Sequence, residues 1–422
     1  MSSSEPPFSL RSVALPAFLP TLLFSIGEGA IIPMIPVAAD SLGATLAIAG
    51  FIASMLMLGE LFGDIPSGTL VSRIGERTAM IGAALLSIVG LVVSLLAPEP
   101  WVLGVGVFLI GIATAVFALA RHAFMTSFVP RHYRARALST LGGIFRAGFF
   151  IGPFLSAAFI HATGSIQSAF WIHIIACLLA AGVLLVLPDP MKAARAQQAA
   201  AGGGPESALL EGEELVAREA HGLFRTIWTY RGVLVKLGSG AALVAAMRAG
   251  RSVLLPLWAV SIGITEANTA LIIGIAGGVD FALFYSSGQI MDRFGRMWSA
   301  MPSMIGLGMG YLVLSLTHEA PANVQWFIAV AVFLALANGI GSGLLMTLGA
   351  DLAPQGNPAP FLGAWRFTGD AGSAAAPLLI SLLTAVASLS IASAVMGVLG
   401  LLGAGILGRY VPRYVPRRPR TT

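Results

Sequence analysis

The sequence predicts an all-α membrane protein of twelve transmembrane helices in two pseudo-symmetric six-helix bundles. Three observations support this fold class. First, 57% of the 422 residues are hydrophobic and only 10% are charged, whereas soluble domains average about 25% charged residues. Second, the apolar residues gather into twelve runs, and an α-helix needs about 20 such residues to cross a bilayer. Third, the polar landmarks of the first half recur in the same order in the second half.

The twelve apolar runs set the predicted spans. In the first half they are Ser12–Pro36, Ala44–Val71, Ala79–Ala97, Trp101–Phe128, Leu138–Ile160 and Gln167–Leu187. In the second half they are Gly232–Ser261, Ala267–Met291, Trp298–Thr317, Val324–Ala350, Phe361–Ala387 and Ile391–Leu407. We therefore expect an N-terminal bundle over residues 1–190, a cytoplasmic linker over 191–226 and a C-terminal bundle over 227–422. The Gly- and Glu-rich composition of the linker is typical of segments that lack a core.

The distribution of Arg and Lys predicts the orientation. Loops at one end of the spans carry Arg residues such as Arg73, Arg131 and Arg293, whereas loops at the other end carry neither Arg nor Lys. Because positively charged loops stay on the cytoplasmic side, we expect both termini in the cytoplasm and the protein in the cell (inner) membrane. The net charge of +5 favours contact with an anionic bilayer over contact with nucleic acid.

The two halves align at an offset of about 220–225 residues. The matching positions are Glu28 with Arg251, Glu60 with Asp280, Arg146 with Arg366, and the turn 41–45 with the turn 261–265. Internal repeats of this kind in a membrane protein imply two bundles that rock about a site near the bilayer midplane.

A short polar pattern occurs once in each half, after the second and the eighth span. The first copy contains Gly68, Arg73, Gly75 and Arg77, and the second contains Gly288, Asp292, Arg293, Gly295 and Arg296. Gly permits the backbone to reverse, and Arg is readily accommodated where headgroups meet water. The pattern resembles the signature loop of the major facilitator superfamily, the twelve-helix secondary transporters. The resemblance covers essentially the whole chain.

A second motif lies in the fifth span, where Gly148, Gly152 and Pro153 resemble the antiporter motif of the exporting branches of that family. Gly lets such a helix pack closely, and Pro bends it. Three features depart from the family pattern. Ser72 stands where the first signature loop usually has Asp, and Val107 stands where proton-coupled exporters have Arg. Ser156 and Ala157 stand where a Gly pair usually follows the fifth-span motif. The resemblance thus implies an exporter whose proton coupling rests on another group.

Ionisable side chains inside the spans are the candidates for binding a substrate and coupling protons. A charge near a helix centre costs about 2.5–3.5 kcal/mol on insertion scales, so each one needs a partner or water. The candidates are Glu28, Glu60, Arg146, Arg248, Arg251 and Asp280. We favour Glu28 as the proton carrier, facing Arg251 in one cavity between the halves. The alternative is that Arg248 and Arg251 only neutralise Glu28. Arg121 is expected near the cytoplasmic surface.

A further set of charged residues predicts a cytoplasmic gate. Arg366 and Asp370 are four residues apart on one helix face and are expected to pair. Asp64 is expected to brace the first signature loop or to take part in coupling. Asp292 is expected to brace the closed gate by accepting bonds from a helix N-terminus and by balancing Arg293 or Arg296.

The functional prediction is secondary active transport of a small, amphipathic molecule by alternating access, with proton-coupled efflux favoured. Two alternatives stay open: uptake or facilitated diffusion of an organic acid, which the arginines favour, and a membrane receptor or scaffold on the same fold. The sequence shows no nucleophile triad, phosphate loop or metal-ligand spacing, so we expect no catalytic residue, cofactor or metal. The expected partners are a small-molecule substrate, protons and the lipid bilayer, and the expected state is a monomer.

Overall fold

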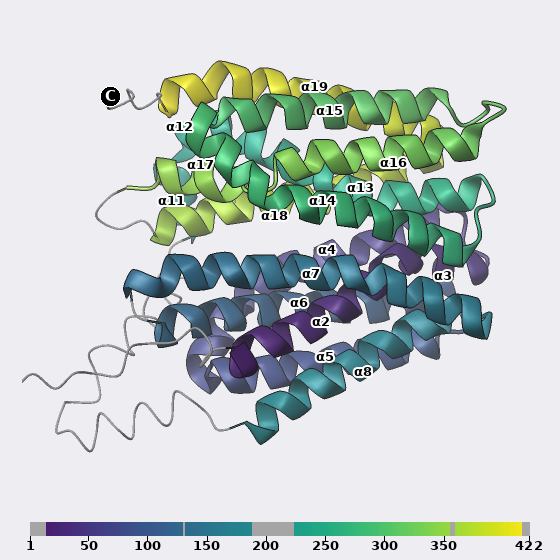
Figure 1. Ribbon diagram of the computed structural model, residues 1–422, viewed down its shortest axis with the longest axis horizontal. Helices are drawn as coiled ribbons and strands as arrows, with labels where there is room; N and C mark the ends of the chain where they lie inside the picture. Colours follow the sequence, from purple (N-terminus) through teal and green to yellow (C-terminus); the bar gives the residue numbers. More distant parts are fainter. Residues whose placement is uncertain (1–13, 130, 188–222, 355–358, 416–422) are drawn as a thin grey trace, which may run out of the picture.

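The computed structural model describes residues 14–129, 131–187, 223–354 and 359–415. Figure 1 shows the N-terminal helices, in purple to blue, gathered in one bundle beside the C-terminal helices, in green to yellow. All run along the long axis of the molecule, and the start of α2 and the end of α19 lie at the same end. Within the described residues, twelve helices are long and apolar enough to cross a membrane. The predicted fold class is therefore confirmed.

The N-terminal bundle contains six spans. Its helices are α2 (Leu19–Ile31), α3 (Ile35–Ser41), α4 (Leu46–Ile74), α5 (Glu76–Leu95), α6 (Pro100–Phe128), α7 (Arg131–Thr163) and α8 (Gln167–Val186). A tighter turn at Ile32–Met34 joins α2 to α3, and the three segments form the first span. This span ends at Ser41 instead of the predicted Pro36. Pro33 and Pro36 lie in the first turns of new helical segments, where a missing N–H breaks no hydrogen bond.

The C-terminal bundle contains the other six spans. Its helices are α11 (Leu223–Thr229), α12 (Arg231–Val233), α13 (Ser239–Ser261), α14 (Glu266–Phe294), α15 (Met297–Leu316), α16 (Asn323–Ile340), α17 (Leu344–Leu352), α18 (Ala359–Val386) and α19 (Leu389–Tyr414). The tenth span, Asn323–Leu352, agrees with the predicted span Val324–Ala350, but it is divided between α16 and α17 at residues 341–343. Residues 191–222 of the predicted linker lie outside the described residues.

Matching turns connect the spans in the two halves. Gly43 and Gly263 have φ of 84° and 74°, and Gly75 and Gly295 have φ of 81° and 94°. Only Gly adopts this left-handed conformation without strain, which explains why these positions recur. The signature patterns themselves are mostly helical, because residues 68 and 288 lie inside α4 and α14. The expected reversal is therefore confined to Gly75 and Gly295.

Backbone contact between α2 and α7 explains the glycines of the fifth-span motif. A Cβ added at Gly152 would lie 2.4 Å from the carbonyl oxygen of Ile26, and one at Gly148 would lie 2.6 Å from Ser25 Cβ. Any side chain at either position would force the two helices apart. This agrees with the close packing expected of the motif. Gly288 differs, because a Cβ there would meet nothing within 4 Å.

The interior and the outer surface of the protein are both apolar. Cys177, in α8, is fully buried in a cluster with Phe24 and Phe117. Large apolar side chains are also exposed, among them Trp171 and Leu178 on the same helix. Water cannot favourably solvate so much exposed apolar surface, whereas the hydrocarbon of a bilayer can.

Candidate functional site

The break in the tenth span brings backbone carbonyls into the middle of the C-terminal bundle. Residues 341–343 read Gly-Ser-Gly, and Gly has a weak helix preference. The end of α16 leaves carbonyl oxygens without helical partners, and within a bilayer such groups need partners from the protein. The carbonyl of Ile340 accepts hydrogen bonds from Ser287 Oγ at 2.7 Å and from Ser299 Oγ at 2.5 Å.

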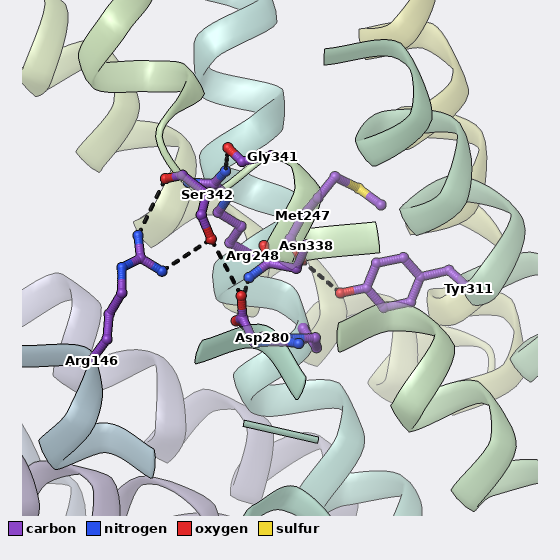
Figure 2. A network of polar contacts seen from close by, with 9 residues as sticks. Arg146, Met247, Arg248, Asp280, Tyr311, Asn338, Gly341 and Ser342 are labelled. Carbon is purple, nitrogen blue, oxygen red and sulfur yellow. Dashed lines mark hydrogen bonds and ion pairs between the residues drawn. The ribbon is translucent and has the colours of Figure 1, made fainter. Parts of the chain in front are cut away.

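Two arginines complete the partners of this turn (Figure 2). Arg248 of α13 donates from Nη2 to the carbonyl of Gly341 at 2.5 Å. Arg146 of α7 reaches across from the N-terminal bundle and donates to Ser342 Oγ at 3.1 Å and to the Ser342 carbonyl at 3.2 Å. Its guanidinium also lies 4.3 Å from the ring centroid of Phe284. Both cations are thus held by neutral oxygens just beyond the C-terminal end of α16, the negative end of its dipole.

Asp280 of α14 is the acidic centre of the same cluster. Its Oδ2 accepts from Arg251 at 2.9 Å and from Asn338 Nδ2 at 2.6 Å, and its Oδ1 accepts from Ser342 Oγ at 3.3 Å. Only 13% of its side chain is exposed. The predicted pairing of Arg251 with Glu28 is therefore not formed, because Arg251 binds a carboxylate on α14 of its own bundle.

Glu28 of α2, the repeat counterpart of Arg251, is the acidic centre of a second cluster, in the N-terminal bundle. It is 2% exposed, and Thr114 of α6 donates to its Oε1 at 2.5 Å. Its Oε2 is buried without a hydrogen-bond partner among the described residues. The charge of Arg121 acts on Glu28, and its guanidinium lies 4.4 Å from the ring centroid of Phe145. The expected position of Arg121 near the cytoplasmic surface stays a prediction.

An ion pair across the two bundles lies toward the end that carries the signature loops. Arg366 Nη2 of α18 is 3.1 Å from Asp64 Oδ1 of α4, and Arg366 Nε is 3.4 Å from Asp370 Oδ2. The predicted pairing of Arg366 with Asp370 is confirmed, with Asp64 as an additional partner. Glu60 lies on α4, one helical turn before Asp64, and the charges of Glu28, Asp64 and Asp370 act on it.

The bundles also touch at the opposite end. Ser381 Oγ of α18 donates to the carbonyl of Ala47, in the first turn of α4, at 2.7 Å. A Cβ added at Gly50 would lie 3.1 Å from Leu257 of α13. The polar clusters around Glu28 and Asp280 are thus bounded by contacts between the bundles at both ends.

The signature loops make bonds within their own bundles. Arg296 donates from Nε to Asp351 Oδ2 of α17 at 2.8 Å and from Nη1 to Asp292 Oδ1 at 3.2 Å. The bond to Asp351 raises the pKa of Arg296. Asp292 balances Arg296 as expected, but its side chain is 80% exposed and this pair does not join the two bundles. In the first loop, Arg77 donates to the carbonyl of Leu187, beyond α8, at 2.5 Å.

Several polar atoms around the two clusters are buried without a hydrogen-bond partner among the described residues. They are Glu28 Oε2, Arg248 Nε, Arg251 Nη1 and Asn338 Oδ1. Native structures pair the great majority of buried polar atoms with protein or ordered water. Because donors and acceptors are both left over, this region is suited to a polar occupant.

The sequence-based prediction missed Thr114, Asn338, Ser342 and Asp351. A signal for two of them is visible in the run Asn338–Gly343, which places Asn, Ser and three Gly residues inside an apolar span. Interrupted spans of this kind mark binding sites in secondary transporters. Thr114 also stands at the repeat offset from Asn338, as Glu28 does from Arg251.

Comparisons with known proteins agree with this architecture. The family model described as Major Facilitator Superfamily matches residues 17–377. The chain is 24% identical over 390 residues to the putative metabolite transport protein YncC of Bacillus subtilis, a match that covers 79% of this chain and 81% of that protein. It is 24% identical over 188 residues to the probable inositol transporter 3 of Arabidopsis thaliana, covering 44% of this chain and 32% of that protein.

A match to the galactose-proton symporter of Escherichia coli K12 has 27% identity over 173 residues and covers 41% of this chain and 37% of that protein. The matches to the inositol transporter and the symporter therefore span about a third of those relatives.

Among solved structures, the inward-open xylose transporter XylE of E. coli aligns with a TM-score of 0.73 at 17% identity, covering 98% of both chains. A POT family transporter aligns with a TM-score of 0.75 at 14% identity, covering 96% of this chain and 97% of that one. These structures establish the fold alone. None of these relatives is named as a drug exporter, so the predicted exporter subtype is not supported.

Proposed function

Since the chain belongs to the Major Facilitator Superfamily, we propose that it takes up a small polar solute by alternating access, coupled to protons through Glu28. The observation that carries this proposal is the environment of Glu28. It is buried within a span, receives one hydrogen bond, from Thr114, and leaves its second carboxylate oxygen without a partner. A carboxylate inside a membrane needs a partner or water, and a proton or a solute group supplies what is missing.

Contacts at both ends of the bundles support alternation between two open states. The bond between Ser381 and Ala47 lies at one end, and the ion pair between Asp64 and Arg366 lies toward the other. The side chain of Arg366 is 48% exposed, and exposed ion pairs contribute only about 0.2–1 kcal/mol. A small difference in free energy between the two states therefore suffices to open one end and close the other.

The unpaired polar atoms buried in the central region support a polar solute. Arg248, Arg251 and Asn338 offer buried atoms that lack partners, and such atoms favour a solute that can form hydrogen bonds. The names of the inositol transporter and the galactose-proton symporter support the same class of solute, and the second name supports movement of solute and proton in the same direction. Efflux of an amphipathic molecule is the second candidate, favoured by the glycine packing of the fifth-span motif.

The proposal is tested with the full chain in proteoliposomes. Labelled galactose and inositol are offered outside, with and without an inward proton gradient, and ethidium serves as the probe for efflux. We expect the gradient to drive accumulation in the wild type and not in Glu28→Gln, while exchange of solute without a gradient persists. Glu319→Gln is the matched control, because Glu319 is 98% exposed in a loop. Full gradient-driven accumulation by Glu28→Gln would exclude Glu28 and leave Glu60 and Asp280. Gradient-dependent movement of ethidium alone would favour efflux.

A further inference from the structure

We propose that the solute carries a carboxylate, and that Arg146 and Arg248 bind this carboxylate between the two bundles, beside the break in the tenth span. This inference rests on the proposed function and narrows its substrate class. The starting point is a local excess of positive charge, in a region where each charge needs compensation.

The cluster contains three guanidinium groups and one carboxylate. Arg146 and Arg248 each interact electrostatically with Arg251 and with Asp280, and no other carboxylate of the described residues is identified as acting on them. Asp280 is already engaged by Arg251, Asn338 and Ser342. Among the described residues, Arg146 and Arg248 therefore donate to neutral oxygens and form no ion pair of their own with a carboxylate.

The present partners of these two arginines are weaker than an anion. Arg146 donates to the hydroxyl and the carbonyl of Ser342, and Arg248 donates to the carbonyl of Gly341 while its Nε remains unpaired. All three acceptors are neutral. Guanidinium presents a planar fork of donors that matches a carboxylate, and an anionic acceptor adds a Coulomb attraction that a neutral oxygen does not supply. The hydroxyl groups of a neutral sugar can replace these bonds but cannot neutralise the charge.

The two arginines come from different bundles, which gives the bound anion a defined position. Arg146 belongs to α7 and Arg248 to α13, and both reach the turn at Gly341 and Ser342 (Figure 2). A carboxylate that binds both side chains replaces the oxygens of this turn as the acceptor of their hydrogen bonds. The same group then links the N-terminal bundle to the C-terminal bundle.

Equilibrium binding to the full chain in lipid nanodiscs tests the inference without a proton gradient. The probes are four carboxylates and their uncharged counterparts: galacturonate with galactose, gluconate with sorbitol, lactate with propane-1,2-diol, and benzoate with benzyl alcohol. Binding is measured as concentration-dependent stabilisation against thermal unfolding at neutral pH. We expect at least one carboxylate to bind about tenfold more tightly than its counterpart, or better.

Four variants locate the bound carboxylate. Arg146→Gln and Arg248→Gln are expected to weaken carboxylate binding about tenfold or more, while binding of the neutral counterpart stays within about threefold. Arg146→Lys keeps the charge but loses the fork, so its affinity falls between wild type and Arg146→Gln. Ser342→Ala removes a hydroxyl that competes for Arg146 and is expected to tighten carboxylate binding, which provides a test even where an arginine variant fails to fold. Arg409→Gln, exposed on α19, is the control.

Three results would overturn the inference: no carboxylate binds better than its counterpart, chloride or sulfate stabilises the protein equally at the same concentration, or the Gln variants and Ser342→Ala leave carboxylate affinity unchanged. Gradient-driven uptake of galactose with no preference for carboxylates rejects this inference and leaves the proposed function intact. Carboxylate binding that requires Arg146 and Arg248, without any gradient-driven uptake, supports this inference and rejects the proposed proton-coupled uptake.

Discussion

The two bundles place polar residues at matching positions, and at one of these, Glu28 and Arg251, the charge is opposite. In the N-terminal bundle, Thr114 donates to the carboxylate of Glu28, which keeps one oxygen unpaired. In the C-terminal bundle, the position equivalent to Glu28 is Arg251, and Asn338, equivalent to Thr114, donates to Asp280. The repeat thus preserves the position of a donor on the fourth span of each half. In the N-terminal half, one carboxylate oxygen of Glu28 has no hydrogen-bond partner among the described residues. In the C-terminal cluster, the guanidinium groups of Arg146 and Arg248 bind neutral oxygens and have no carboxylate bound to them.

The fourth span of each half also differs in continuity. After Thr114 the helix α6 continues through Ala, Val and Phe, whereas after Asn338 the chain reads Gly-Ile-Gly-Ser-Gly and leaves the helix at residues 341–343. Side chains of at least four helices bind the carbonyls that this break releases. The fourth span is therefore a continuous helix in the N-terminal half, whereas in the C-terminal half it contains a turn whose backbone carbonyls accept hydrogen bonds from side chains.

The largest expected effect comes from removing the only carboxylate of the C-terminal cluster. Asp280→Asn leaves Arg251 without its ion pair, and breaking a buried pair typically costs about 3–5 kcal/mol. Denaturant unfolding in micelles is the measurement, with exposed Asp292→Asn as the control at under about 1 kcal/mol. Because Glu28 has one hydrogen bond, we expect Glu28→Gln to cost less than Asp280→Asn. Equal losses of unfolding free energy in Asp280→Asn and Glu28→Gln would contradict the proposed difference between the two clusters.

The next effect concerns the donors that the two halves share. Thr114→Val removes the one side-chain hydrogen bond that Glu28 receives among the described residues, and a hydrogen bond to a charged group contributes about 1.5–3 kcal/mol. Asn338→Leu leaves Asp280 two other donors and should cost less. A double-mutant cycle between Thr114→Val and Glu28→Gln checks the assignment, because the loss from Thr114→Val should shrink in the Glu28→Gln background. Strict additivity would show that the bond contributes little.

Two glycines of the motifs should respond differently to the same added methyl group. Gly152→Ala places a Cβ against the backbone of α2 and should destabilise the protein by about 1–3 kcal/mol. Gly288→Ala meets open space and should be neutral or stabilising by up to about 1 kcal/mol, the helix preference of Ala over Gly. Thermal unfolding of the two variants side by side is sufficient. A greater loss at Gly288 would reverse the roles assigned to the two positions.

The smallest effect is expected at the ion pair that joins the bundles. Asp64→Asn removes a partly exposed partner of Arg366 and should cost about 0.2–1 kcal/mol. Its consequence should appear as faster hydrogen exchange at the ends of α4 and α18 that lie near the signature loops. Asp292→Asn should leave this exchange unchanged, because Asp292 binds Arg296 within one bundle. Faster exchange in Asp292→Asn alone would restore Asp292 as the residue that braces the gate.

Sequence patterns predicted the spans better than the contacts between them. Apolar length and the positive-φ glycines at 75 and 295 depend on local chemistry, which is why the helices and matched turns were found. The partner of Arg251 depends on how α13 and α14 are rotated against each other, and hydropathy carries no information on this rotation. The break at Gly341–Gly343 was missed because the tenth span was predicted from the length of its apolar run, which small Gly and Ser residues do not interrupt. Asp351 was missed because it lies at the predicted end of that span.

The burial of Cys177 has a practical consequence for following the movement of the two bundles. It is the only cysteine of the chain, and its side chain is fully buried within α8. Maleimides dissolved in water react with accessible thiolates, so a thiol in apolar surroundings is inert to them. Two cysteines introduced at exposed positions, one in each bundle, would be the only groups modified. Distances between the bundles can thus be tracked by thiol labelling in a protein that keeps its native Cys177.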